Sequence, residues 1–374
     1  MKAMRRLEQG QGRAKCVLVT GATGYLGRLV TATLLRRTDH KLLLPIREHR
    51  SSVQTVKSIV EEARHLGFAC DPGWPRRLAV FNVGLLGPSP DILAIAQKNE
   101  VREIVHCAGQ ANYTSRQNLH DSNVRLTERM VELARCIQVE RFFHLSTAFS
   151  SGLINDVIRE CLHKQIAVGP TYYMESKRQS EWAVASGGIP YVIIRPGIVI
   201  GDSISGAYRG RPLGVYQVWS AGQRYLFSRA IDEVRMPIAD TPIPLIHADM
   251  FAKAFWLAYA YCRPNSILNI VSPLQGCPTL RDMMELWFEV NGRPESVLYM
   301  TKRRYAQSSD LGPAHKAFYR VAGANLAIAC HPWYFVSSVE ELGRKHGVAL
   351  PRTSLASVKT CLRRFLDGEL CLRG

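Results

Sequence analysis

The sequence lacks an apolar run long enough to cross a membrane. The longest run, residues 251–262, is interrupted by Lys253 and falls well short of the roughly 20 residues that a bilayer requires. The basic segment 1–15 is followed only by the apolar stretch 16–19, which is too short for the core of a signal peptide. We therefore expect a cytoplasmic protein with no transmembrane segment, and peripheral contact with a membrane stays open.

Closely spaced cysteines and metal-ligand patterns are also missing. The ten cysteines are scattered along the chain, which is typical of a reduced, cytosolic protein. No ligand cluster indicates a bound metal, so we predict none. His106 and His144 lie in apolar segments, and we interpret them as packed core residues. His247 and Asp249 are interpreted as parts of a structural hinge.

Acidic residues are scarce. The chain has 31 Asp and Glu against 48 Lys and Arg, which gives a formal net charge of +17 and a surface that favours polyanions. No zinc-ligand spacing and no aromatic ribonucleoprotein-like motif is visible, so we expect no nucleic-acid binding. Two interpretations stay open: a solvated basic surface, or recognition of a substrate that carries phosphates or rides on an acidic carrier protein.

What the sequence does contain is an alternation of apolar strands and helical segments. A helix is predicted at residues 29–36, and strands are predicted at residues 16–20, 41–46, 78–83, 104–107, 142–146 and 191–194. Near-continuous apolar strands separated by helices are typical of a parallel sheet covered on both faces. We therefore predict an α/β fold: a doubly wound parallel sheet of the Rossmann type, with a smaller C-terminal substrate-binding lobe.

The alternation loosens from about Gly201, where segments rich in Gly, Pro and Arg predict loops that lead into the second lobe. Three parts follow: an N-terminal tail, a nucleotide-binding domain and a substrate-binding lobe (residues 1–15; 16–202 with 245–272 returning to it; 203–244 with 273–374). Near the C-terminus, one helical face predicts a core contact rather than a membrane anchor. That face carries Leu355, Val358, Leu362 and Phe365.

A glycine-rich turn follows the first predicted strand. Gly21 allows a sharp exit from the strand, Gly24 lets the backbone approach a ligand, and Gly27 permits close helix packing. Because the N-terminus of a helix favours anions, we expect a dinucleotide pyrophosphate there. The predicted contacts are Gly21, Thr23, Gly24, Tyr25, Leu26 and Gly27.

The second predicted strand indicates which dinucleotide is bound. An acidic side chain about 20 residues after the turn selects NAD, whereas an arginine there accommodates the 2′-phosphate of NADP. Arg47 stands twenty residues beyond Gly27, and Arg28 could reach the same phosphate. Glu48 would become the ribose ligand if the register slipped by one residue. We predict NADPH, with NADH as the less favoured alternative.

A phenol and an ammonium are spaced by one helical turn downstream. Tyr173 and Lys177 share a helix face, so both can point at one substrate carbonyl and the nicotinamide ribose. We expect the ammonium to lower the pKa of the phenol, which then donates a proton to a developing alkoxide. Thr147 is our choice for the hydroxyl that orients the carbonyl, with Ser146 second. Tyr172 is an off-by-one alternative to Tyr173.

Taken together, these motifs resemble the extended short-chain dehydrogenase/reductase superfamily over residues 16–257. The resemblance implies that Ala108, in the stretch 106–109, lies beside the cofactor, that Asn123 supports the active site, and that Pro196 lies against the nicotinamide. Within the superfamily, the chain is most similar to the thioester reductase and fatty acyl-CoA reductase branch. That similarity is carried by residues 21–28, 146–148 and 194–203, with weaker support from 331–335.

The resemblance implies hydride transfer from NADPH to an acyl thioester on coenzyme A or on an acyl or peptidyl carrier protein. Thr147 would hold the oxyanion, Tyr173 would protonate it, and loss of the thiol would release an aldehyde that a second hydride could convert to the alcohol. The chain departs from the family where Asn82 stands in place of an aspartate near the adenine. The loop 149–169 carries no family signature.

Two other functions stay open. The first is another enzyme of the superfamily, acting on a hydroxysteroid, a ketone or a sugar nucleotide. The second is a non-catalytic protein that senses NADP(H), because a fold does not by itself imply catalysis.

Overall fold

We describe the fold from a computed structural model of the chain. It describes residues 14–47, 49–83, 90–111, 115–163, 171–227, 233–292, 296–309 and 311–371. Glu48 therefore lies outside the described residues, as do most of the predicted N-terminal tail and part of the loop 149–169.

A seven-stranded sheet forms the centre of the part that the sequence predicts to bind a nucleotide, and all neighbouring strands run parallel. The strand order is β10-β6-β5-β4-β1-β2-β3. The strands are β1 (Cys16–Thr20), β2 (Lys41–Arg47), β3 (Leu78–Val83), β4 (Val101–His106), β5 (Arg141–Leu145), β6 (Tyr191–Pro196) and β10 (Ser266–Ile270). This confirms the predicted doubly wound fold. The order reverses between β1 and β4, so a crevice for ligands is expected at the carboxyl ends of these two strands.

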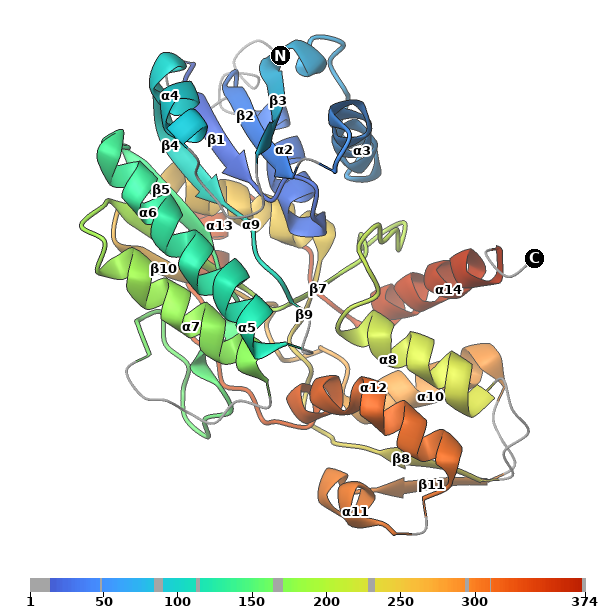
Figure 1. Cartoon of the computed structure of the whole chain (residues 1–374). Helices are drawn as coiled ribbons and strands as arrows, with labels where there is room; N and C mark the ends of the chain where they lie inside the picture. The colour runs from blue at the N-terminus through green and yellow to red at the C-terminus, as the bar shows by residue number, and fades with distance from the viewer. Residues whose placement is uncertain are drawn as a thin grey trace.

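Helices cover both faces of this sheet (Figure 1). Along β1, Val17 packs with α2 and α9 on one face, whereas Leu18 packs with α6 and α7 on the other. Such burial on both faces explains the continuous apolar runs. The helices are α2 (Tyr25–Arg37), α3 (Ser52–His65), α9 (Ala248–Tyr261) and α13 (Val339–Lys345), and opposite them α4 (Pro90–Lys98), α6 (Leu126–Cys136) and α7 (Tyr172–Ala185).

Short turns join these elements. The turn α5 (Arg116–Leu119) runs through the π-helical turn η2 (His120–Arg125) into α6, and 3-10 turns precede β3 and follow β5 as η1 (Trp74–Arg77) and η3 (Ala148–Ser151). Strand β10 was not among the predicted strands because Ser266 and Asn269 interrupt its apolar pattern. The amide of Asn269 is buried and donates to the carbonyl groups of Ile158 and Val336.

The second lobe has a core of its own, in which α8, α10, α12 and α14 pack together (Figure 1). Its elements are β7 (Ile198–Ile200) with β9 (Leu245–His247), β8 (Glu233–Pro237) with β11 (Ser296–Met300), α8 (Val215–Gly222), η4 (Gln223–Phe227), α10 (Leu280–Asn291), α11 (Lys302–Gln307), α12 (Pro313–Ala329) and α14 (Leu355–Cys371).

Helix α14 presents most of the predicted apolar face to this core. Val358 and Leu362 are fully buried and Phe365 packs against the same cluster, whereas Leu355 at the first turn is 43% exposed. Among the described residues, no helix combines the length and the apolar character that a bilayer-spanning segment needs.

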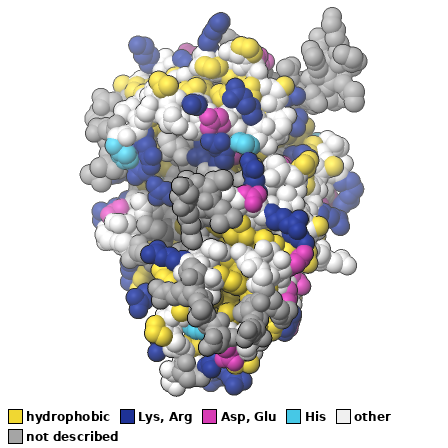
Figure 2. Space-filling view, turned by 90° about the vertical axis from the view of Figure 1, so that its right-hand side faces the viewer, with side chains coloured by type: hydrophobic (Ala, Val, Ile, Leu, Met, Phe, Trp, Pro, Cys, Tyr) yellow, Lys and Arg dark blue, Asp and Glu magenta, His cyan; other side chains and the backbone are white. Residues whose placement is uncertain are grey.

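Basic side chains are spread over the face of the molecule that Figure 2 shows. Figure 2 shows Lys and Arg side chains from top to bottom of the face in view, with few Asp and Glu between them. On this face, the excess of basic residues counted in the sequence is spread out and not confined to one patch.

Candidate active site

The glycine-rich turn lies between β1 and α2, against the end of β4. Gly21 has φ +72°, and a Cβ there would lie 2.6 Å from the amide nitrogen of Ala108. A Cβ on Gly27 would lie 2.1 Å from the carbonyl oxygen of Gly21, whereas one on Gly24 would lie 3.3 Å from that oxygen. Gly21 and Gly27 are thus required by backbone packing alone. The turn could not close with side chains at these two positions.

The first turn of α2 is open to an anion. Gly24 is the N-cap, so no side chain caps the helix, and the first turn contains no acidic residue. The N–H groups at the start of this 13-residue helix, from Tyr25, Leu26 and Gly27, therefore carry the positive end of the helix dipole without a competing carboxylate. This arrangement fits the pyrophosphate of a dinucleotide.

Ala108 lies directly beside the turn, and the contact with the cofactor that the family resemblance implied stays a prediction. Its N–H donates to the hydroxyl of Thr20 at the end of β1 (3.2 Å), and the same hydroxyl pairs with Nδ1 of His106 (2.7 Å). The other ring nitrogen of His106 pairs with Thr127 (3.1 Å). These contacts hold the carboxyl ends of β1 and β4 at a fixed separation, and they give His106 a structural role.

The two arginines predicted to bind the 2′-phosphate differ in their contacts. Arg47 ends β2 with an exposed side chain. Arg28 is held by Glu62 (3.0 Å) and donates to the carbonyl groups of Thr23 (3.0 Å) and Arg209 (2.6 Å), so binding a phosphate would require it to exchange these partners. Its role as a phosphate ligand remains a prediction.

Arg50 is a cofactor candidate that the sequence reasoning missed. Its N–H donates to the carbonyl of Arg47 (2.8 Å), which places the two side chains on one turn after β2. Its Nε is buried and finds no hydrogen-bond partner in the structure described. The sequence feature that could have indicated it is the spacing of Arg50, three residues after Arg47.

Tyr173, Lys177 and Thr147 converge at the carboxyl end of β5. Tyr173 and Lys177 lie one turn apart on α7, and the Tyr173 phenol forms a hydrogen bond with the Thr147 side chain. Lys177 is buried, and its ammonium donates to the carbonyl of Leu145 (2.7 Å). Tyr172, by contrast, is 48% exposed, and the guanidinium of Arg116 lies over its ring. The off-by-one alternative therefore faces away from this cluster.

The electrostatics differ from the expectation for Tyr173. Burial raises the pKa of its phenol to about 12, and the hydrogen bond with Thr147 only partly opposes this rise. Burial also lowers the pKa of Lys177 to about 8. The expected lowering of the phenol pKa by the ammonium is therefore wrong for this structure, because desolvation disfavours the phenolate and the ammonium is turned toward Leu145. At neutral pH the phenol is protonated and can donate a proton.

Asn123 ties the segment after β4 to α7, the helix that carries Tyr173 and Lys177. Its amide nitrogen donates to the carbonyl of Gln110 (3.0 Å) and to the hydroxyl of Ser176 (2.9 Å), and its amide oxygen accepts from the N–H of Gln110 (2.8 Å). It lies in the π-helical turn η2, an irregularity that often marks functional sites. Asn123 therefore contacts the helix that carries Tyr173 and Lys177, and its supporting role in an active site stays a prediction.

Pro196 ends β6 at the same edge of the sheet. It is buried, and the next residue, Gly197, donates to the carbonyl of Ile270 (2.9 Å). A Cβ on Gly197 would lie 2.5 Å from the carbonyl oxygen of Pro244. The backbone here is fixed by strands on either side, and the predicted nicotinamide contact stays a prediction.

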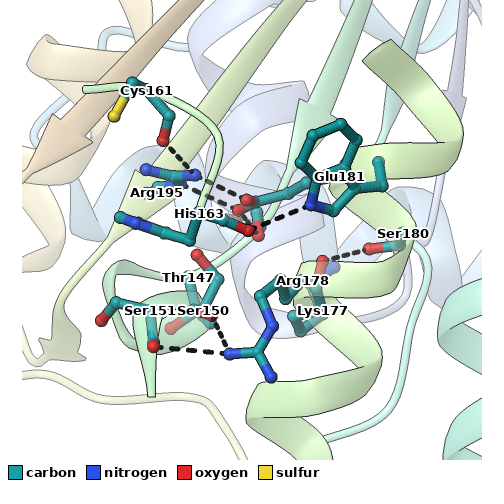
Figure 3. A network of polar contacts seen from close by, with 12 residues as sticks. Thr147, Ser150, Ser151, Cys161, His163, Lys177, Arg178, Ser180, Glu181 and Arg195 are labelled. Carbon is teal, nitrogen blue, oxygen red and sulfur yellow. Dashed lines mark hydrogen bonds and ion pairs between the residues drawn. The ribbon is translucent and has the colours of Figure 1, made fainter. Parts of the chain in front are cut away.

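A buried polar network lies beneath Thr147, and sequence reasoning missed it (Figure 3). Glu181 and Arg195 form an ion pair with both side chains fully buried, and the hydroxyl of Ser146 donates to Glu181. Because Ser146 is engaged there, Thr147 is the hydroxyl left beside Tyr173. A carboxylate one turn after Lys177 was the available signal.

The C-terminal part of the chain reaches this cluster. Trp333 packs edge-on against Phe149 (ring centroids 4.9 Å apart), and both join Met174, next to Tyr173, in one apolar cluster. The indole N–H of Trp333 donates to the carbonyl of Ile328 at the end of α12 (2.8 Å). The second lobe thus packs against the residues that flank Thr147 and Tyr173.

The remaining polar candidates have structural contacts. His144 is buried against Ser180 (3.0 Å), and His247 bridges the carbonyl of Gly201 and the hydroxyl of Ser357 (both 2.8 Å). Asn82 is exposed near the end of β3, and its adenine role stays a prediction. Within the described ranges, no group of His, Cys, Asp and Glu could hold a metal ion.

Comparison with known proteins places these features in a family. The family model described as male sterility protein matches residues 19–255. Fatty acyl-CoA reductase 1 of Homo sapiens is 26% identical over 232 residues, which is 50% of this chain and 43% of the human protein. The chain thus matches less than half the length of this curated relative.

Solved structures share the fold. The terminal R domain from the myxalamid PKS-NRPS biosynthetic pathway superposes with a TM-score of 0.76 at 18% identity, covering 96% of this chain and 92% of that domain. UDP-glucuronic acid 4-epimerase from Bacillus cereus, solved with UDP-glucuronic acid and NAD, gives a TM-score of 0.60 at 13% identity over 93% and 99% of the two chains.

The family match covers more than half of the sequence, and it includes the glycine turn, Thr147, Tyr173 and Lys177. The resemblance predicted from those motifs is confirmed. The chain belongs to the male sterility protein family of NAD(P)-binding domains, with the extended short-chain dehydrogenase/reductase fold.

Proposed function

We propose that this protein reduces an acyl thioester, carried by coenzyme A or by an acyl or peptidyl carrier protein, to an aldehyde or alcohol with NADPH. The observation that carries the proposal is the convergence of Thr147, Tyr173 and Lys177 at the carboxyl edge of the sheet, beside the turn where the cofactor would bind. The acyl substrate is inferred from the family, in which the human relative is named a fatty acyl-CoA reductase.

In this mechanism, Thr147 and Tyr173 hold the carbonyl oxygen of the thioester. Bound NADPH would supply the hydride that the carbonyl carbon accepts. Tyr173 then gives its proton to the oxyanion of the hemithioacetal, and its raised pKa keeps that proton available at neutral pH. Loss of the thiol releases the aldehyde. Lys177, one helical turn after Tyr173 on α7, would hold the ribose hydroxyls of the cofactor.

The N-terminal turn of α2 would hold the pyrophosphate, with Gly21 and Ala108 packed behind it. We also propose that residues 16–202 and 245–272 form the cofactor domain, and that 203–244 and 273–374 form the substrate lobe. The separate apolar cores support this division for most of its length, except that α13, within 273–374, packs against α9 and β10 of the cofactor domain. We further propose a cytoplasmic location, supported by the nine cysteines whose side chains the structure describes, which are all free thiols.

The direct test is incubation of the protein with NADPH and a panel of acyl-CoAs and carrier-bound acyl groups. We expect NADPH consumption, with aldehyde or alcohol identified by mass spectrometry. Ketone, steroid and sugar-nucleotide substrates are the controls. Turnover of these alone, or net-neutral isomerisation of a sugar nucleotide, would replace the proposed substrate class with another one of the superfamily.

Cofactor choice gives a separate prediction. Replacing Arg47 with Gln should weaken NADPH binding by roughly 10- to 100-fold, because hydrogen bonds to charged groups contribute about 1.5–3 kcal/mol. NADH binding should stay the same, since it has no 2′-phosphate. Fluorescence titration with both nucleotides measures the two affinities, and Arg36→Gln, at the far end of α2, serves as the control. Equal losses for both nucleotides would refute this prediction.

A further inference from the structure

Glu181 and Arg195 form a buried ion pair directly behind the candidate catalytic residues. Both side chains have zero exposure, and two contacts join them, from Nε to Oε1 (2.9 Å) and from a terminal nitrogen to Oε2 (2.6 Å). This two-point geometry fixes the orientation of both groups. Burying two charges is a poor way to gain stability, so the pair calls for another explanation.

The pair joins four parts of the chain. Arg195 comes from β6 and Glu181 from α7, and Ser146, just after β5, donates its hydroxyl to the Glu181 carboxylate. The remaining N–H groups of Arg195 donate to the carbonyls of Arg159 (3.3 Å) and Cys161 (3.0 Å). Figure 3 shows the contacts of Arg195 with Glu181 and Cys161 grouped on one side of Thr147.

The spacing on α7 connects the pair to the site. Tyr173, Lys177 and Glu181 follow one another at intervals of four residues, so they occupy one face of the helix. Lys177 donates to the carbonyl of Leu145, and Glu181 accepts from the next residue, Ser146. The two side chains therefore hold consecutive residues of the turn that ends at Thr147.

We propose that Glu181 is a positioning residue for carbonyl reduction: its carboxylate, oriented by Arg195, fixes the Ser146–Thr147 turn and faces the Lys177 ammonium. The part that concerns catalysis rests on the proposed function. The part that concerns Lys177 also applies to cofactor binding, because the same ammonium is expected to hold the ribose.

The charge on Lys177 provides a readout that a merely structural residue would not change. Burial lowers its pKa to about 8, while the negative charge of Glu181 raises it and Cys107 raises it further. The ammonium is the working form, and it is lost as pH rises through this value. Removing the Glu181 charge lowers the pKa, so the ammonium should be lost at a lower pH. The titratable groups that interact with it are Glu181 of α7, His106 and Cys107 at the end of β4, and His144 of β5, while Arg195 of β6 is paired with Glu181.

The test compares Glu181→Gln with Glu103→Gln in the full-length protein. Glu103 is an equally buried carboxylate, paired with Arg141 (2.7 Å), but it lies toward the opposite end of the sheet. NADPH affinity is measured by fluorescence across pH, together with the thermal midpoint and the kcat for an acyl-CoA. Both variants should lose stability. Only Glu181→Gln should move the alkaline loss of NADPH binding to lower pH, by about one unit, and lower kcat at neutral pH by about tenfold or more.

If Glu181→Asp loses NADPH binding at the same alkaline pH as the wild type, the result would support the role of the carboxylate charge. Identical pH profiles for wild type, Glu181→Gln and Glu103→Gln would overturn the proposal. If Glu181→Gln does not fold, Ser146→Ala is the deciding variant, because it removes only the contact between the Glu181 carboxylate and the turn. Its kcat should fall, while the pH profile of NADPH binding should stay unchanged. An unchanged kcat would overturn the proposal. If the wild type reduces no acyl thioester, the proposed function fails, while the binding profile still tests Glu181.

Discussion

Replacing Tyr173 with Phe should lower kcat by roughly 100- to 10,000-fold, the range that a positioned general acid contributes. The phenol is the group beside Thr147 that can protonate an oxyanion, and its pKa of about 12 means that it carries its proton throughout the working pH range. NADPH binding should persist, because the cradle of the α2 turn does not involve this phenol. Steady-state kinetics and NADPH fluorescence separate the two effects.

The neighbouring residue supplies a matched control. Tyr172→Phe makes the same chemical change one position away, on a side chain that is 48% exposed and stacked under Arg116. It should leave kcat within about twofold, since surface substitutions usually change little. If Tyr173→Phe kept the full biological effect of the protein, and that effect still required NADPH, the result would favour a non-catalytic cofactor sensor over an enzyme.

Replacing Gly27 with Ala should weaken NADPH binding by about 5- to 150-fold, equivalent to 1–3 kcal/mol. The added Cβ would lie 2.1 Å from the carbonyl oxygen of Gly21 and 2.6 Å from its carbonyl carbon. Both are backbone atoms, so the turn must move away from α2, and the N–H groups that should face the pyrophosphate move with it. Isothermal titration with NADPH measures the loss, and thermal unfolding measures the accompanying destabilisation.

Gly368→Ala is the control for this substitution. Gly368 lies in α14, and a Cβ there meets nothing within 4 Å. Alanine should leave NADPH binding unchanged and stabilise the helix by up to about 1 kcal/mol. If Gly27→Ala bound NADPH as tightly as Gly368→Ala did, the close packing at the turn would have no bearing on the cofactor.

The strands could be predicted because their signal is local. Residues 16–20 and 78–83 were predicted with the bounds that β1 and β3 have in the structure. The signal is clearest in β1, whose five residues are all buried, because a strand covered on both faces is apolar throughout. Strand β10 escaped prediction because Asn269 breaks its pattern, and that amide is satisfied only by carbonyls at residues 158 and 336. The sequence around residue 269 cannot reveal these partners, because both lie more than 60 residues away along the chain.

The sequence by itself determined the parallel α/β fold, the glycine turn after the first strand and the spacing of Tyr173 and Lys177, because each depends on residues close together in the chain. Tertiary structure decided between near neighbours: Tyr173 faces Thr147 while Tyr172 faces solvent, and Ser146 is bound to Glu181. It also reversed the expected pKa shift of the phenol. Burial and long-range partners set these outcomes, and both arise only when distant segments pack together.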